Sequence, residues 1–82
     1  MIYGYAAKKV DEYGLLEMKE VTIEASAQVL REMAQFLAEM ADLMDAGGFS
    51  RCSHRHIGSV IKDWDKRFPG KDLIVMPSGE SL

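Results

Sequence analysis

The sequence contains little of what stabilises secreted or membrane-inserted proteins. Its 82 residues include one cysteine, Cys52, which excludes an intramolecular disulfide and agrees with a reducing compartment. No segment approaches the roughly 18 consecutive apolar residues of a transmembrane helix, and residues 1–5 lack the basic start and apolar stretch of a signal peptide. We therefore predict a cytoplasmic protein that does not insert into membranes.

Basic charge is also scarce. Residues 1–47 hold four basic and nine acidic side chains, whereas residues 48–82 hold six basic and four acidic ones, and the whole chain has a net charge of −3. Phosphate backbones bind to clustered basic surfaces. We therefore do not expect nucleic acid as the main ligand.

The chain is short for a folded domain. With 48% hydrophobic and 28% charged residues it is apolar enough to fold, but a chain of this length buries only about 60% of the surface that its unfolded form exposes. We predict one α+β domain over residues 1–77, followed by a loose tail over residues 78–82. Because self-association would bury more surface, a homodimer is an alternative to a monomer.

The first 25 residues have the alternation of β-strands. Residues 2–6 predict one strand, and a charged segment that ends in Gly14 suits a hairpin connection to a second strand over residues 15–25. In the second strand the apolar positions change from even to odd numbers. A β-bulge near Lys19-Glu20 would bring both apolar sets to one face, because it adds one residue to the strand. The alternative is that both faces are partly covered.

A helical period begins after Ser26. Apolar residues recur at intervals of three and four and together form one wide apolar face. Ser26 is placed to cap the N-terminus, and Gly47-Gly48 is placed to end the helix. The predicted apolar positions are Val29, Leu30, Met33, Ala34, Phe36, Leu37, Met40, Ala41, Leu43 and Met44.

The last third of the chain contains two further apolar patterns. One recurs at intervals of four, three and four and consists of Ile57, Ile61, Trp64 and Phe68. It predicts a short amphipathic helix or turn from Gly58 to Lys66, in which Trp64 is favoured as a core anchor over a ligand-stacking residue. The other pattern, the apolar run at residues 72–76 between turn residues, predicts a buried strand.

Together these elements predict an α+β fold. We expect a small antiparallel or mixed sheet, made of the N-terminal hairpin plus the C-terminal strand, packed against one long amphipathic helix, with a second short helix or turn. Each element has one apolar side to bury, and this arrangement buries all of them. Residues 49–56 are polar and carry no pattern that assigns them to an element.

The sharpest chemical pattern is formed by Cys52, His54 and His56, which are spaced two residues apart. On an extended backbone their side chains would point to one face, where a thiolate and two imidazoles could bind a transition metal. A structural zinc site uses four ligands, and no adequate fourth is evident. We therefore predict no metal, no other cofactor and no catalytic residue. A small metal-binding or metal-dependent protein that uses these three residues is the alternative.

Two tyrosines of the first strand, Tyr3 and Tyr5, are candidates for contacts with another protein. A tyrosine combines a large apolar ring with a polar tip and is enriched in protein interfaces. The long helix can cover at most one face of the first strand. One side of this strand should therefore face outward.

The order of several short segments carries a family resemblance that spans about residues 2–77. The segments are Ile2-Tyr3-Gly4-Tyr5, Leu16-Glu17-Met18-Lys19-Glu20-Val21-Thr22, Glu24-Ala25-Ser26 at the start of a helix that carries Leu30, Phe36 and Leu37, Ser53-His54-Arg55-His56, Trp64 and Asp72-Leu73-Ile74-Val75. In this order the chain resembles the small bacterial proteins grouped as immunity protein family thirty-two of polymorphic toxin systems. The resemblance implies an α+β protein, not an enzyme, that neutralises a cognate toxin by forming a stoichiometric complex.

The resemblance also indicates where a partner would bind. The acidic solvent face of the helix would suit a basic toxin, and an exposed polar loop such as residues 54–56 is where binding residues tend to lie. The candidate partner-binding residues are Glu32, Glu39, Asp42, Tyr3, Tyr5, His54, Arg55 and His56. A metal-dependent protein and a structural homodimeric module are the competing hypotheses.

Overall fold

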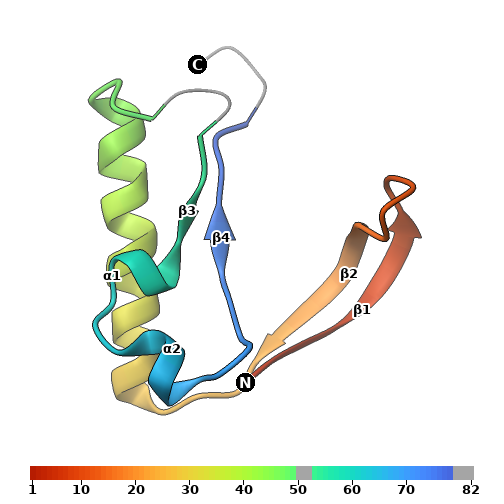
Figure 1. Ribbon diagram of the computed structural model, residues 1–82, viewed down its shortest axis with the longest axis horizontal. Helices are drawn as coiled ribbons and strands as arrows, with labels where there is room; N and C mark the ends of the chain where they lie inside the picture. Colours follow the sequence, from red (N-terminus) through yellow and green to blue (C-terminus); the bar gives the residue numbers. More distant parts are fainter. Residues whose placement is uncertain (50–52, 79–82) are drawn as a thin grey trace.

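The structure, a computed structural model, describes residues 1–49 and 53–78. Its elements follow in the order β1 (Ile2–Lys9), β2 (Leu16–Ile23), α1 (Ala27–Asp45), β3 (Arg55–His56), the 3-10 turn η1 (Ile57–Ser59), α2 (Trp64–Arg67) and β4 (Ile74–Val75). This is the α+β layout that the sequence predicts. The helix α1 lies along β3 and β4, while the β1–β2 hairpin extends away from them (Figure 1). Of the predicted tail, only Ser78 belongs to the described residues.

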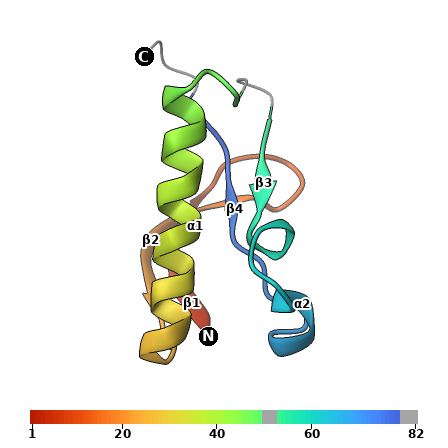
Figure 2. The ribbon, with the colours of Figure 1, turned by 90° about the vertical axis from the view of Figure 1, so that its left-hand side faces the viewer.

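The strands form two separate antiparallel sheets, β1 with β2 and β3 with β4. The sequence predicted that the C-terminal strand would join the hairpin, and in this detail the structure differs. The Ile57 amide donates to the Leu73 carbonyl at 2.9 Å, and the Trp64 indole N–H donates to the Lys71 carbonyl at 3.0 Å. These two bonds hold the approach to β4 against the β3–α2 segment, so β4 pairs with β3 beside α1 (Figure 2).

The strand β4 is shorter and less buried than predicted. It covers two residues, flanked by extended chain, where the sequence predicted a buried strand over residues 72–76. Leu73 and Val75 pack against the core, whereas Ile74 and Met76 are exposed. The alternation arises because α1 covers only one face of the β3–β4 sheet.

The hairpin contains the predicted bulge. Tyr5 pairs with Glu20 and Ala6 pairs with Met18, so Lys19 is the extra residue on β2. A second irregularity between Ala6 and Lys8 adds Ala7 on β1. The bulge at Lys19 resolves the change of parity in the sequence, because it returns the apolar positions on either side of it to one face.

The helix α1 begins and ends as its sequence predicts. The Ser26 hydroxyl accepts a hydrogen bond from the Val29 amide at 3.2 Å, which satisfies one of the first free amides of the helix. At the other end Gly47 has a φ of +75°. Its amide donates to Met44, and the Gly48 amide donates to Leu43. This pair of bonds is a Schellman motif, which requires a left-handed residue and therefore favours glycine.

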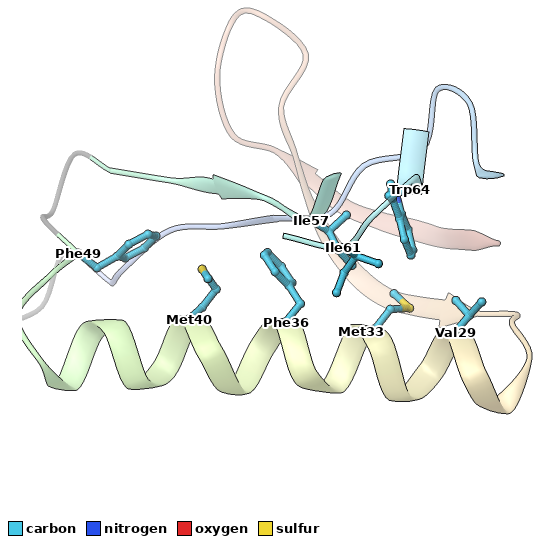
Figure 3. Packing of buried hydrophobic residues seen from close by; sticks show 8 residues of the cluster. All are labelled: Val29, Met33, Phe36, Met40, Phe49, Ile57, Ile61 and Trp64. Atoms are coloured by element: carbon cyan, nitrogen blue, oxygen red, sulfur yellow. The ribbon is translucent and has the colours of Figure 1, made fainter. Parts of the chain in front are cut away.

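The core lies between α1 and the segment from Phe49 to Trp64 (Figure 3). Phe36, Ile57 and Trp64 are its largest fully buried side chains. The buried residues are Val29, Met33, Phe36, Met40, Phe49, Ile57, Ile61 and Trp64. Trp64 is thus the core anchor that its spacing predicted.

The apolar face of α1 is narrower in the structure than in the prediction. One row is buried, but Leu30 and Leu37 of the second row are 44% and 48% exposed. A two-stranded β3–β4 sheet is too narrow to cover both rows of the helix. Among the described helices, none combines the length and apolar character that crossing a lipid bilayer requires.

The predicted helix or turn from Gly58 to Lys66 is divided into two short pieces. η1 ends at Ser59 and α2 begins at Trp64. Asp63, just before α2, has a φ of +60°, a left-handed conformation that aspartate tolerates better than most residues. The break reorients the chain so that both Ile61 and Trp64 reach the core.

Candidate protein-binding groove

A groove of about 520 Å³ lies between the C-terminal half of α1 and the β3–η1 segment. The groove is open to solvent along its length. The helix supplies one wall, because residues spaced three and four apart lie on one stripe. Its lining residues are Glu39, Met40, Asp42 and Leu43 from α1, the C-cap residue Ala46, and Arg55, Ser59 and Val60 from the facing segment.

The groove brings together three of the predicted partner-binding residues. Glu39 and Asp42 stand one turn apart on α1, and Arg55 comes from β3 across the groove. Met40, Leu43 and Val60 add apolar surface between these charges. The lining thus combines apolar side chains with two carboxylates and one guanidinium, a composition typical of recognition sites.

The electrostatics of the groove favour a cation. The last turn of α1 contains no basic residue, although it carries Asp42 and Asp45. The free carbonyls at a helix C-terminus already bear partial negative charge, so acidic side chains there are unfavourable and a bound cation is favourable. Glu39 is held in place by Gln35, whose amide donates to a Glu39 oxygen at 3.1 Å. The lining holds two carboxylates, Glu39 and Asp42, against one guanidinium, Arg55, so the groove has an excess of negative charge on its helix side.

Arg55 is positioned by an aromatic ring. Its guanidinium carbon lies 5.9 Å from the centre of the Phe49 ring, within the range of a cation–π contact. Phe49 is itself part of the core. The Arg55 guanidinium is therefore held over a buried ring, on the wall of the groove that faces α1.

The two histidines lie outside the groove lining. The ring centres of His54 and His56 are 5.1 Å apart, so the two-residue spacing does bring them to one side, as predicted. His56 Nδ1 lies 2.6 Å from a carboxylate oxygen of Asp72. This contact spans the β3–β4 pair at the His56 end and gives His56 a structural role.

The predicted tyrosines stand on a different part of the molecule. Tyr3 and Tyr5 are 58% and 70% exposed on the hairpin, and they share a face with Thr22 and Glu20, their partners in register. Neither tyrosine lines the groove. The candidate contact residues therefore belong to two surfaces, the groove and the hairpin.

Glu32 forms an ion pair with Arg67 of the same chain. Its two carboxylate oxygens accept hydrogen bonds of 2.8 Å from the two terminal nitrogens of Arg67. The Glu32 side chain is only 17% exposed. The pair fastens α2 to the first half of α1, 35 residues away in sequence. Glu32 is thus less suited to an external partner than its place on the acidic face suggested.

The Glu32–Arg67 pair predicts an acid-dependent stability. The Arg67 hydrogen bonds hold the pKa of Glu32 below its usual value of 4.5. Because the pKa of Glu32 is lower in the folded chain, the ion pair stabilises the fold fully at pH values above the usual pKa. This stabilisation is lost as the pH falls through the lowered pKa of the folded state. We expect Glu32→Gln to lower the urea midpoint at pH 7 and to differ less from wild type below about pH 4.

The matched control for this pair is Glu12→Gln, an exposed carboxylate that forms no ion pair among the described residues. It should leave the urea midpoint unchanged at both pH values. A constant difference between wild type and Glu32→Gln from pH 7 to pH 3 would contradict the assigned ion pair.

Of the three candidate metal ligands, Cys52, His54 and His56, the structure describes the two histidines. Among residues 1–49 and 53–78, no group of three histidine, cysteine, aspartate or glutamate side chains is placed to hold a metal ion. Cys52 lies outside the described residues. The expectation that Cys52, His54 and His56 hold no metal therefore stays a prediction.

Sequence reasoning named three of the eight lining residues of the groove as contact residues, Glu39, Asp42 and Arg55. Leu43 and Ala46 could have been found from their spacing with Glu39 and Asp42, which places all four on one stripe of the helix. Ser59 and Val60 of the facing wall could not have been found, because they carry no distinguishing pattern in the sequence.

Comparisons with models of known protein families, with characterised proteins and with solved structures find no match to this chain.

Proposed function

We propose that the protein is an immunity protein that binds a cognate toxin of the same cell in a stoichiometric complex, with a basic segment of the toxin seated in the groove. The sequence resemblance supports the class of function. The single observation that carries the binding mode is the placement of Glu39 and Asp42 in a groove at the C-terminal end of α1.

The groove suits an arginine or lysine side chain of the partner. The aliphatic part of such a side chain would pack on Leu43 and Val60, and its charged end would reach Glu39 and Asp42. Arginine fits better than lysine, because its planar guanidinium can bind two carboxylate oxygens at once. Arg55 adds selectivity, since it repels a second cation and attracts an acidic neighbour of the bound residue.

Complementary charge of this kind raises the association rate more than the final affinity. A protein that must capture a toxin soon after its synthesis benefits from fast encounter. The sign and position of the groove charges support this role, which requires no chemical step on the partner.

The test is to co-express the protein with the toxin candidate encoded beside its gene, and to measure survival together with complex formation by the purified proteins. We expect survival, a one-to-one ratio of the two chains, and an association rate that falls as salt is raised, since exposed charges are screened beyond about 8 Å at physiological ionic strength. No complex and no protection would remove this proposal. A complex whose association rate ignores salt would keep the immunity function but exclude the groove charges.

A further inference from the structure

The β1–β2 hairpin has one apolar face. Register pairs Ile2 with Ile23, Gly4 with Val21 and Ala6 with Met18, and strand alternation adds Leu16 to the same side. The Met18 methyl group occupies the place where a side chain at position 4 would stand, which shows that Met18 lies across this face. We call these seven residues, Ile2, Gly4, Ala6, Leu16, Met18, Val21 and Ile23, the hairpin apolar face.

Most of this face is uncovered in the single chain. The four large side chains that β2 contributes, from Leu16 to Ile23, are between 42% and 56% exposed. Only the base of the hairpin, at Met1 and Ile2, packs against the core. An isolated two-stranded hairpin is at best marginally stable in water and needs a further layer on its apolar side. The hairpin apolar face therefore lacks a covering layer.

The chain as a whole exposes more surface than a compact monomer of its mass, and the outstretched hairpin contributes to this excess. The chain has an accessible surface of 6298 Å², whereas a compact monomer of 9.2 kDa would expose about 4,900 Å². The excess of about 1,400 Å² exceeds the roughly 800 Å² that each partner buries in a standard stable interface. The radius of gyration, 13.9 Å, also exceeds the value of about 12 Å for a compact domain of this length.

The strand edges of the hairpin are protected against pairing. β2 carries the Lys19 bulge, and β1 carries the Ala7 irregularity next to Lys8 and Lys9. Bulges and lysines on edge strands discourage the addition of a further strand. A covering layer should therefore approach the face of the hairpin and not its edges.

We propose that a second copy of this chain supplies the layer, and that two copies pack through their hairpin apolar faces in a symmetric dimer. A twofold axis matches a surface with itself, and this face suits such a match because it has an uncharged centre. Lys9, which pairs with Leu16, lies at its far end. If the covering layer were a different protein, the hairpin apolar face would be exposed to solvent whenever that protein was absent.

The dimer leaves the groove accessible. The hairpin joins the rest of the chain before the N-terminus of α1 (Figure 1). The groove is lined by residues of the C-terminal half of the same helix. Two grooves would then face solvent on each dimer. The dimer does not depend on the proposed function, but if both hold, the complex with the toxin contains two copies of each chain.

The test is the mass of the purified protein by sedimentation equilibrium across the micromolar range. Wild type should have twice the mass of the 9.2 kDa chain. Val21→Lys should raise the dissociation constant of the dimer by at least about 100-fold, because each interface would bury two unpaired charges. Thr22→Lys, the neighbouring position on the opposite face, adds the same charge and should leave the dissociation constant within about threefold of wild type.

A gentler variant covers the case in which Val21→Lys fails to fold. Val21→Thr keeps the branched shape and should raise the dissociation constant about tenfold, because two buried methyl groups per dimer are replaced by hydroxyls. A monomeric wild type across this concentration range would overturn the proposal. So would a dimer that survives both Val21 variants, or one that Thr22→Lys dissociates as strongly as Val21→Lys.

Discussion

Phe36→Ala should remove most of the free energy of unfolding of the protein. Phe36 is fully buried at the centre of the row that α1 presents to the core. Its truncation removes the ring and leaves a cavity, which costs roughly 3–5 kcal/mol. A domain of ordinary stability has only about 5–15 kcal/mol in total, and a chain of this length should lie near the lower end. Urea denaturation followed by circular dichroism measures the effect.

The neighbouring residue provides the control. Leu37→Ala removes an apolar side chain from the same helix, but Leu37 is 48% exposed and its loss should cost less than about 1 kcal/mol. Alanine also favours the helix as well as leucine does. Equal urea midpoints for the two variants would mean that the buried face of α1 is assigned incorrectly.

The parts of the fold that the sequence predicted depend on neighbouring residues. The Ser26 cap and the Gly47-Gly48 stop each involve residues within one helical turn. The Lys19 bulge is visible as a change of parity within one strand. Such features follow from the geometry of a single element, so a short stretch of sequence contains all the information they need.

The parts that differ depend on which distant segments meet. The C-terminal strand pairs with Arg55-His56, two polar residues without alternation. Their strand conformation comes from the partner and not from their own sequence. The width of the buried helix face likewise depends on the second layer, because the β3–β4 sheet covers Phe36 and leaves Leu37 outside.

In the candidate site, too, the sequence pattern did not show which distant residues meet. Charge along the helix predicted an acidic surface from Glu32 through Glu39 to Asp42, but Glu32 meets Arg67, which is 35 residues away. A helix pattern identifies residues on one face and cannot show which of them already have a partner. The structure therefore divides the predicted surface into an internal ion pair at Glu32 and a groove at Glu39 and Asp42.

A charge-reversal experiment on the groove should therefore change Glu39 and Asp42 and leave Glu32 intact, because Glu32 binds Arg67. We expect the double variant Glu39→Lys, Asp42→Lys to weaken binding of a basic partner at least about 100-fold and to abolish protection of cells that express the toxin, because two attractive contacts become repulsive. The same changes should not harm the fold. A basic residue in the last helical turn, here at position 42, is favourable by about 0.3–1 kcal/mol. This gain offsets the loss of the exposed hydrogen bond from Gln35 to Glu39, so the variant should be about as stable as wild type.

A second double variant separates the position of the charges from their total. Glu12→Lys, Glu20→Lys reverses two exposed acids on the hairpin. Each reversal adds two charges, so both double variants change the net charge from −3 by the same amount, four units. Calorimetric titration with the toxin should show near-normal binding for the hairpin variant and none for the groove variant. Equal losses would indicate that overall charge, and not the groove, determines binding. A groove variant that is as stable as wild type and yet fails to protect would show that the carboxylates of Glu39 and Asp42 are required for binding the partner and not for folding.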